Sequence, residues 1–516
     1  MNKILIYFRT SLILTILLMP VLFFTVGFAS EITTFQSQTS ISTLKSWTVK
    51  LNNEIDSTSI SSNSVLIKDS KGTIINTTVT LGEDKKSLII DPPIDGFIPN
   101  QNYYITINEN LKSATGEALS NSATMQFTTI NKYEDTSSFS ELPQVKDLKI
   151  LEQPLVKNDS LRMELTSNTD SFVQYRIFLY AYPNGFFDST YKYGNVNYTE
   201  LTNGFTAPVQ GTTPYTFSST KNLIAGKYRI LVYVKKANVQ GIHSSIYTDY
   251  DNFYTDYVRV LEKNAMENSS INETYTYVNS NKTLSEAVNI QYTKGAPNHD
   301  EASSLWVPVT SHIISYYMNP YNFLDDYGKY MFLDLHYMEG VLPEDLNKVL
   351  LGKGILEGIG EEFINAGKKN NINPIYLVSH SLLETSNGTS SLSNGVLVSE
   401  VDGQAVQPKI VYNLFGVNAK NTDAIKYGSE YAYKKGWFSI EEALSGGAYY
   451  IGSSYINNTL YNRNTLYKIR WFTENDWAYP QYSTDIAWAY KQITNIKTLF
   501  DKIDSGNPVF QIPVYK

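Results

Sequence analysis

The spacing of apolar residues divides the chain into two parts. From about residue 31 to 262, apolar and β-branched residues form short runs separated by Gly, Pro, Asn, Asp and Ser, which is typical of strands. From about residue 285, apolar residues recur at helical spacing. The pattern therefore predicts a multidomain protein with two N-terminal all-β sandwich domains, followed by a mainly α-helical domain.

The first β region shows its clearest hairpin between Val65 and Leu81, where two β-branched runs flank the turn Asp69 to Gly72. Further short strands follow, and strands at such regular spacing predict a sandwich. The segment resembles bacterial immunoglobulin-like domains of the surface-layer type, so residues 36–131 are assigned to one such domain. The resemblance rests on WTVKLNNEID, PNQNYYITIN, LKSATGEAL and the closing FTT.

A second β-rich region, residues 143–262, contains a strong strand from Ala225 to Ala237 and an aromatic stretch from Tyr247 to Leu261. It resembles the tyrosine-rich β-sandwich repeats of bacterial surface proteins. Its tyrosines could stack on sugar rings, and the alternative is ordinary aromatic packing between strands. Residues 263–284 are polar and are predicted to be a linker before a catalytic domain at 285–516.

In the C-terminal part, five stretches have helical spacing in addition to the one described next. They are residues 304–320, 356–370, 424–437, 439–456 and 486–500. Between Ser393 and Tyr412 the residues instead alternate around Gly403, which predicts a small β-hairpin lobe.

The stretch from Asn373 to Gly395 carries the main candidate for chemistry. Asn373 can cap a helix whose first position is Pro374, and apolar residues follow at helical spacing. The helix pattern ends at Glu384, before a polar run. Partial burial and the negative end of the helix dipole both raise the pKa of a carboxyl there. Such a group can act as a general acid, and the alternative is a solvated residue at a helix end.

Composition and charge narrow the class of protein. The 516 residues are 42% hydrophobic and 18% charged, with a net charge of −8 and no basic block, so nucleic acid is not expected as a partner. Lys3, Arg9, an apolar run from Ser11 to Phe28 and a small-residue cleavage pattern predict a signal peptide over residues 1–29. The only membrane attachment that we consider is this signal peptide remaining uncleaved as an anchor.

Several chemistries lack support in the sequence. Without any cysteine there is no thiol catalysis, zinc–thiolate site or disulfide. His380 and Glu384 have the i, i+4 spacing of a metal pair, but no second histidine lies nearby, so neither a metal nor a cofactor is expected. The glycines between Gly352 and Gly360 do not form a phosphate loop and are expected to pack closely on a neighbour.

Carboxylates remain, and glycoside hydrolysis commonly uses two of them. Glu384 is the candidate acid. Glu400 and Asp402 on the predicted hairpin, and Asp485 in QYSTDIAWAY, are candidates for the second group. Asp485 follows Ser483 and Thr484 and could equally cap the next helix.

Several separate motifs then match one family in order. They are YYMNPYNF, INPIYLVSHSLLETSNGTSSLSNG, YNLFGVNA, YAYKKGW, SIEEALSGGAYYIGSSYI, NTLYKIRW and QYSTDIAWA. Through them, residues 306–489 resemble the endo-β-N-acetylglucosaminidases of glycoside hydrolase family seventy-three, which cut bacterial peptidoglycan. The resemblance implies a lysozyme-like helical fold with a groove for the glycan strand.

The resemblance also implies roles for individual residues. Glu384 matches the catalytic acid and Tyr482 a functional tyrosine beside the groove, and the other residues listed are expected to contact sugar: Tyr412, Asn413, Phe415, Gly416 and Ser390. The second group is Glu400, Asp402, Asp485 or the substrate's own N-acetyl group. Ser386 stands where the family usually has Gly, and Pro480 where it often has His.

Together these observations predict a secreted, cell-wall-associated hydrolase. It would cleave the β-1,4 bond after N-acetylglucosamine in peptidoglycan glycan strands, with Glu384 as general acid. One alternative is a lytic transglycosylase acting at the muramic acid linkage. Another is a non-catalytic wall-binding protein with a degenerate enzyme domain, of which Ser386 would be a sign.

Overall fold

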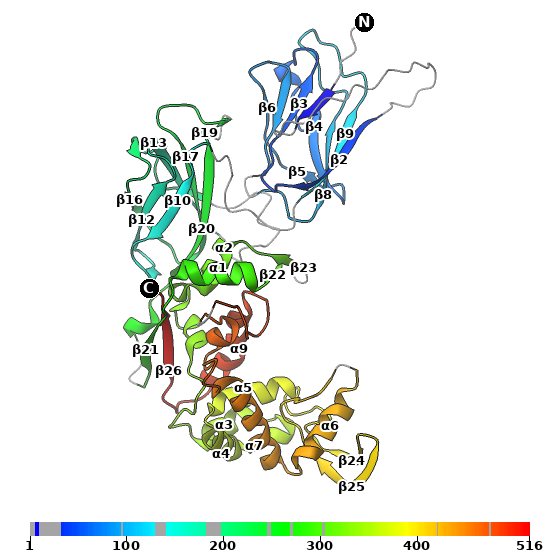
Figure 1. Ribbon diagram of the computed structural model, residues 1–516, viewed down its shortest axis with the longest axis vertical. Coiled ribbons are helices and arrows are strands. Elements are labelled where there is room, and N and C mark those ends of the chain that lie inside the picture. Colours follow the sequence, from blue (N-terminus) through cyan, green and yellow to red (C-terminus); the bar gives the residue numbers. More distant parts are fainter. Residues whose placement is uncertain are drawn as a thin grey trace. The chain divides into compact units, whose positions relative to one another are not determined.

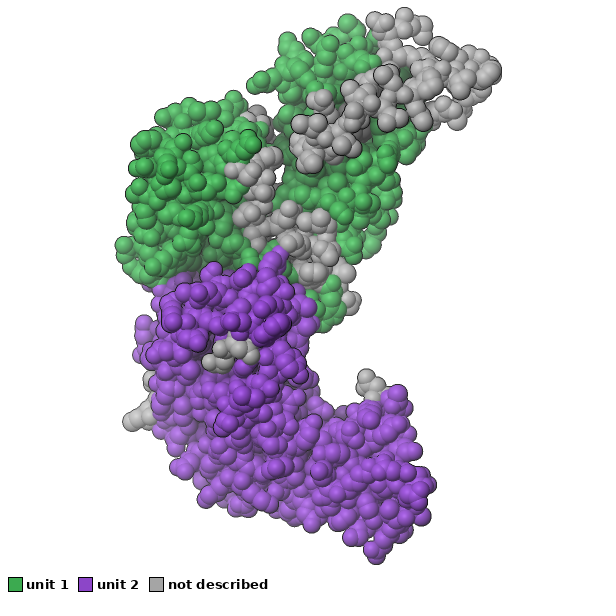
Figure 2. All heavy atoms as spheres, viewed as in Figure 1, with its two compact units in different colours: residues 1–152, 160–258, 298–313 green, residues 153–159, 259–297, 314–516 purple. Residues whose placement is uncertain are grey.

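A computed structural model describes residues 6–9, 32–93, 96–129, 141–181, 198–244, 249–268, 272–301, 305–420, 422–473 and 476–516. The chain forms two compact units (Figure 2), one of residues 1–152, 160–258 and 298–313, the other of residues 153–159, 259–297 and 314–516. The apolar run predicted as a signal, residues 11–28, lies outside the described residues. Among the helices of the described ranges, none has the length and apolarity that crossing a membrane requires.

The N-terminal β region consists of two sheets that share one core. One sheet has the order β2-β9-β8-β4-β5 and the other β1-β3-β7-β6. The strands are β1 (Ile6–Arg9), β2 (Thr33–Ile41), β3 (Trp47–Leu51), β4 (Val65–Asp69), β5 (Ile74–Ile75), β6 (Val79–Leu81), β7 (Ser87–Ile90), β8 (Asn102–Ile107) and β9 (Ala123–Thr129). The core contains Trp47, Phe97, Tyr103 and Phe127, with ring centroids 4.8 to 5.3 Å apart in the contacting pairs. The predicted hairpin is confirmed, because β4 pairs with β5 around Gly72 at φ +83°.

The second β region is also strand-rich. One sheet has the order β10-β12-β16, and the other runs β11-β20-β17-β13-β14, with β15 paired to β13. The strands are β10 (Val145–Ile150), β11 (Leu155–Val156), β12 (Ser160–Ser167), β13 (Phe172–Ala181), β14 (Tyr198–Glu200), β15 (Val209–Gln210), β16 (Tyr215–Asn222), β17 (Gly226–Lys236) and β20 (Asn252–Leu261). The aromatic rings of this region pack on one another: Tyr233 and Tyr250 stack with centroids 4.3 Å apart. Tyr233 and Tyr250 thus show the aromatic packing between strands that was the alternative to sugar binding.

The C-terminal part is mainly helical with a small strand lobe, as predicted (Figure 1). Its helices are α1 (Leu284–Lys294), α2 (Ser311–Met318), α3 (Pro343–Leu350), α4 (Gly360–Asn370), α5 (Pro374–Glu384), α6 (Ala424–Lys435), α7 (Ile440–Ile451), α8 (Leu466–Arg470) and α9 (Trp488–Phe500). The predicted hairpin is β24 (Val396–Val401) with β25 (Gln404–Val411), joined by Asp402 and Gly403 in the left-handed conformation. Lys434 of α6 bonds Asp402 of the hairpin turn, so the lobe is held against α6.

Two segments differ from their sequence patterns. The polar stretch 263–284 contains β21 (Thr274–Asn279), which pairs in parallel with β26 (Val509–Val514) near the end of the chain (Figure 1). The first part of the helical pattern at 304–320 is extended: β23 (Leu305–Pro308) pairs with β22 (Asn298–Glu301), and the helix begins only at Ser311. Each of these strands is stabilised by pairing with another strand. The spacing of apolar residues within one segment does not reveal such pairing. The domain boundaries expected from the sequence stay predictions.

Candidate active site

Helix α5 begins as its sequence predicts. Asn373 is the N-cap, and its Oδ1 accepts the backbone N–H groups of Ile375 at 3.0 Å and Tyr376 at 3.3 Å. Pro374 occupies the first turn, where its missing N–H costs nothing. The apolar side chains Ile375, Leu377 and Val378 are fully buried, so one face of the helix is fixed in the core. The start of this helix is therefore rigidly defined.

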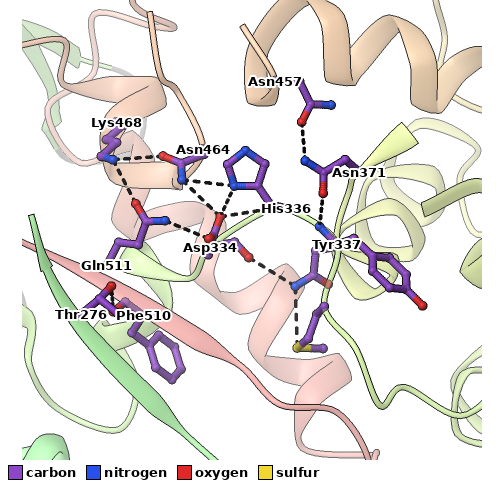
Figure 3. A network of polar contacts seen from close by, with 12 residues as sticks. Thr276, Asp334, His336, Tyr337, Asn371, Asn457, Asn464, Lys468, Phe510 and Gln511 are labelled. Carbon is purple, nitrogen blue, oxygen red and sulfur yellow. Dashed lines mark hydrogen bonds and ion pairs between the residues drawn. The ribbon is translucent and has the colours of Figure 1, made fainter. Parts of the chain in front are cut away.

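A network of polar contacts anchors the same end of α5 to distant parts of the chain (Figure 3). Asp334 accepts hydrogen bonds from His336 Nδ1 at 2.7 Å, Asn464 Nδ2 at 3.2 Å and Gln511 Nε2 at 2.8 Å. Lys468 Nζ donates to both Asn464 and Gln511 at 3.0 Å. The backbone carbonyl of Asp334 accepts from the Nδ2 of the Asn373 cap at 3.4 Å. The network thus ties α5 to α8 and β26.

Glu384 is the last residue of α5, and its carboxyl group lies in a mostly uncharged setting. Its side chain is 39% exposed, and partial burial raises its pKa above the ordinary value. His380 Nε2 lies 3.8 Å from Glu384 Oε1. Burial lowers the pKa of His380 to about 4, so the imidazole is neutral near pH 7 and provides no cation to hold Glu384 ionised. Partial burial and the absence of a neighbouring cation on His380 thus both favour the protonated form of Glu384, relative to an exposed glutamate.

The loop after Glu384 is ordered by Thr385 and by two glycines. Thr385 is fully buried, and its Oγ1 donates to Ser381 O at 2.6 Å and accepts from Gly388 N at 2.8 Å. A Cβ at Gly388 would meet Lys353 O at 1.9 Å, and one at Gly354 would meet Gly388 O at 2.4 Å. Within the glycine-rich stretch, Gly354 thus packs closely on the loop beside Glu384, whereas Gly352 and Gly358 have nothing within 4 Å of an added Cβ.

Ser386 has a left-handed backbone, with φ +51°. Glycine adopts this conformation without strain, whereas other residues pay of order 1 kcal/mol. The structure thus gives a physical reason for the glycine that the resembling family has at this place. Ser386 still adopts the turn, so the substitution does not disrupt it.

The carboxyl group of Glu384 opens into a cleft of about 480 Å³. The residues that line the cleft are Tyr376, Ser379, His380, Leu383, Glu384, Phe415, Gly416, Val417, Asn418, Tyr450, Ile451, Tyr455, Leu466, Ile469, Tyr482, Trp488, Gln492, Asn495 and Ile496. Among these described residues Glu384 is the one carboxylate, and none is Lys or Arg. The cleft is therefore an aromatic, nearly neutral groove with a single candidate acid.

The loop that carries Phe415 and Gly416 approaches Glu384 closely. Gly416 has φ +61°, and a Cβ there would lie 2.9 Å from Glu384 Oε2. Phe415 packs its ring against that of His380, 5.8 Å away at 87°. Asn413, expected to contact sugar, is buried and instead donates its Nδ2 to Val417 O at 2.9 Å and Gly428 O at 3.2 Å. Phe415 and Gly416 thus lie in the cleft, and Asn413 holds their loop.

Tyr482 also lies in the cleft. Arg470 donates hydrogen bonds to the turn that carries Tyr482. Tyr482 is 50% exposed and its ring lies 5.0 Å from that of Trp488. Arg470 is fully buried, and its guanidinium donates to Asp485 O at 2.7 Å and Thr484 O at 3.0 Å. Burial lowers the pKa of Arg470 to about 9. The Tyr482 turn is thereby fixed to α8.

The other predicted carboxylates lie outside the cleft lining. Glu400 is an exposed residue of β24, and Asp402 pairs with Lys434. Asp485 is buried, accepts Ala487 N at 3.0 Å just before α9 and pairs with Lys491 at 2.7 Å. The N-cap of α9 is Ala487 and no side chain caps this helix, so Asp485 does not act as its cap but bonds the turn just before it.

Two further predicted sugar contacts are held in loops. Ser390 N donates to Thr385 O at 2.9 Å and its Oγ donates to Ser393 Oγ at 3.0 Å. Tyr412 N donates to Trp437 O at 3.0 Å. Neither residue lines the cleft as the structure has it.

Some cleft residues were missed by the sequence reasoning, although a signal for two of them exists. Tyr376 and His380 precede Glu384 by eight and four positions, which places them on its face of the helix. Tyr450 and Tyr455, at the end of the long helical pattern 439–456, gave no comparable signal. In the described parts of the chain, no group of three or more His, Cys, Asp or Glu side chains is placed to hold a metal ion.

Comparison with known proteins assigns the domain that holds this cleft. Residues 360–500 match the sequence model of the Glucosaminidase family, described as mannosyl-glycoprotein endo-beta-N-acetylglucosaminidase. That range runs from α4 to α9 and includes Glu384, Phe415, Gly416 and Tyr482. Residues 360–500 are a glucosaminidase-family domain. Residues 30–129 match a bacterial Ig-like domain, as the first β region predicted.

Two curated relatives are also similar to part of this chain. A β-N-acetylglucosaminidase of Bacillus subtilis is 44% identical over 213 residues, which are 41% of this chain and 23% of that protein. A bifunctional autolysin of Staphylococcus epidermidis is 37% identical over 248 residues, 48% of this chain and 18% of that protein. The chain thus spans about a fifth of the length of each. The crystal structure of S. aureus glucosaminidase B is 34% identical, with a TM-score of 0.43, and the match covers 47% of this chain and 94% of that one.

Proposed function

We propose that this protein is a secreted, cell-wall-associated hydrolase that cleaves the β-1,4 bond after N-acetylglucosamine in peptidoglycan glycan strands. The observation that carries the proposal is the position of Glu384. Its carboxyl group is the one carboxylate among the described lining of an aromatic cleft, and burial raises its pKa. The family assignment of residues 360–500 supports the same reaction class.

In the proposed reaction Glu384 donates its proton to the glycosidic oxygen as the C1–O bond breaks. As that bond breaks, the acetamido carbonyl oxygen of the same sugar bonds to C1, and a water then attacks C1 and breaks this new C1–O bond, which regenerates the acetamide. Glu384, now ionised, takes a proton from the attacking water, which restores the acid. The net result adds one water across the bond and leaves a new reducing end on N-acetylglucosamine.

The N-acetyl group of the substrate is the nucleophile that the cleft favours. Glu400, Asp402 and Asp485 lie outside the cleft lining, and Asp402 and Asp485 are paired with lysines. An acetamido carbonyl oxygen travels with the sugar and lies next to C1, so it needs no second carboxylate. We therefore assign Asp485 a structural role beside α9.

A lytic transglycosylase remains the closest alternative, because it too can work with a single glutamic acid. Mass spectrometry of digested peptidoglycan separates the two reactions. The proposal predicts fragments with a reducing N-acetylglucosamine end. Fragments that end in anhydro-muramic acid would overturn it in favour of transglycosylation.

The second alternative, a non-catalytic wall-binding protein, rested on Ser386. Because Ser386 adopts the left-handed turn and Thr385 Oγ1 bonds both Ser381 O and Gly388 N, the geometry beside Glu384 does not support degeneration. We propose that the two β domains position the glucosaminidase domain on the wall. Binding of a protein lacking residues 32–258 to purified walls, compared with the full chain, tests this part of the proposal.

A further inference from the structure

Helix α7 ends in a widened turn that borders the cleft. After Ile451 the chain continues as a π-helix over Gly452–Ile456, and Asn457 N donates to Gly452 O at 2.8 Å, five residues back. In an α-helix, residues five apart point about 140° away from each other. One extra residue in the turn brings such a pair toward the same side, and π-turns of this kind recur at functional sites.

Close packing on the end of α4 holds this turn in place. A Cβ at Gly452 would meet Asn457 Nδ2 at 2.8 Å and Asn370 O at 3.3 Å. Asn457 Nδ2 donates to Asn370 O at 2.7 Å, and its Oδ1 accepts from Asn371 Nδ2 at 3.0 Å (Figure 3). Asn371 in turn accepts from Tyr337 N at 3.3 Å (Figure 3). These contacts hold the π-helical turn in a defined conformation, so it is not a frayed helix end.

The consequence is that Tyr450 and Tyr455 both line the cleft that contains Glu384. Tyr450 is 42% exposed and Tyr455 is half-buried. The guanidinium of Arg463 lies 4.7 Å from the ring centre of Tyr455 and donates to Ser454 O at 2.8 Å, which holds this ring in one orientation.

The tyrosines that line the cleft lie close enough to influence one another's pKa. Burial raises the pKa of Tyr376, and the nearby Tyr455, Tyr482 and Glu384 raise it further. Burial likewise raises the pKa of Tyr455, with Tyr450 and Tyr482 acting on it as well. The two rings presented by the turn therefore belong to the same groove as the catalytic candidates.

We infer that Tyr450 and Tyr455 form a sugar-binding subsite, which the π-turn creates by placing both rings on one wall. The ligand class is a pyranose ring of a β-1,4-linked N-acetylhexosamine chain. A tyrosine offers an apolar face for the ring's C–H groups and a hydroxyl for its polar rim. A cleft with no charged lining residue other than Glu384 suits a neutral sugar. The inference rests on the proposed function and specifies where that substrate is held.

The test measures binding of a β-1,4-linked N-acetylglucosamine tetrasaccharide to the full chain carrying Glu384→Gln, which prevents turnover, by isothermal titration calorimetry. Tyr450→Ala and Tyr455→Ala, each added to this parent, should weaken binding about tenfold, whereas the Tyr→Phe variants should stay within about threefold. Tyr449→Ala is the matched control. Tyr449 is the neighbouring residue of α7, is 68% exposed and does not line the cleft, so its loss should leave affinity unchanged.

The outcomes separate the two proposals. If the parent binds the tetrasaccharide and both alanine variants bind equally well, the subsite is overturned and the proposed function stands. If the parent fails to bind and the wild type also leaves peptidoglycan intact, the proposed function is overturned and the subsite with it. Thermal melting checks that each variant folds. Should Tyr455→Ala not fold, Tyr455→Leu keeps most of the volume without the ring, and the same loss of affinity is expected.

Discussion

The side chains of His380 and Glu384 lie 3.8 Å apart, between His380 Nε2 and Glu384 Oε1, on consecutive turns of α5. They form no charged pair near neutral pH, because burial lowers the pKa of His380 to about 4. His380 packs edge-on against Tyr376 and Phe415, with ring centroids 5.7 and 5.8 Å away. The imidazole is therefore an uncharged side chain next to Glu384, and it makes the stability of the protein depend on pH.

The first prediction concerns stability and pH. Between the folded pKa of His380, about 4, and the unfolded value of 6.5, the unfolded chain binds more protons, so the contribution of neutral His380 is lost as pH falls. This loss amounts to at most about 3 kcal/mol. The free energy of unfolding of wild type minus that of His380→Gln should therefore decrease from pH 7.5 to pH 4.5 in denaturant titrations. A difference that is constant, or that grows toward acid, would contradict the neutral histidine.

The second prediction concerns the pH dependence of catalysis. In the proposed reaction Glu384 acts in its protonated form, so kcat/KM on a soluble glycan fragment should be level in acid and fall about tenfold per pH unit above the pKa of Glu384. Because burial raises that pKa, the fall should begin above the ordinary value of 4.5. A decline centred at or below pH 4.5 would show that Glu384 is not the group that titrates.

A third prediction uses two glycines that share a left-handed backbone. Gly416, at φ +61°, faces Glu384 Oε2, whereas Gly403, at φ +78°, has nothing within 4 Å of an added Cβ. Alanine at either place should cost roughly 1 kcal/mol of stability in thermal unfolding. Only Gly416→Ala should also lower kcat, by more than about tenfold, since its methyl group would displace the carboxyl group. Equal activity of the two variants would mean that the position of Glu384 is not critical.

The fourth prediction is that Ser386→Gly stabilises the protein. Ser386 has φ +51° and is exposed, so glycine relieves backbone strain, which the greater freedom of the unfolded chain offsets in part. The net gain should be about 0.5–1 kcal/mol in denaturant titrations, with unchanged wall lysis. A loss of stability would mean that the serine makes a contribution beyond its backbone geometry.

Much of the acid's own setting could be predicted from the sequence. The Asn373 cap, Pro374 and the apolar spacing define α5, and the helix ends at Glu384 as the pattern indicates. The hairpin around Gly403 followed from alternation and a glycine. These features are local, because capping, periodicity and turn chemistry each act within a few residues.

The features that local patterns missed depend on distant partners. Residues 274–279 look like a polar linker, yet they pair with β26, more than two hundred positions away. Asn413 belongs to a motif expected to touch sugar, but its amide is used inside the protein by Val417 and Gly428. The π-turn after Ile451 adds one residue to a helical pattern, which apolar spacing does not resolve, so Tyr450 and Tyr455 were not foreseen.

The fifth prediction contrasts the four candidate carboxyl groups, each replaced by its amide. Glu400→Gln and Asp402→Asn should keep activity within about threefold, because both residues are exposed and lie outside the cleft lining. Asp485→Asn should lower the melting temperature, since it weakens the pair with Lys491, while kcat falls much less than for Glu384→Gln. A collapse of activity in a stably folded Glu400, Asp402 or Asp485 variant would identify a second catalytic carboxylate.

The most direct measurement is the release of reducing ends from purified peptidoglycan by wild type and by Glu384→Gln. Both proteins should first be matched for melting temperature and for wall binding. The account predicts that wild type generates reducing N-acetylglucosamine ends and that Glu384→Gln is slower by about a thousandfold or more, as expected for loss of the general acid. A folded Glu384→Gln protein that cleaves at the wild-type rate would contradict the account.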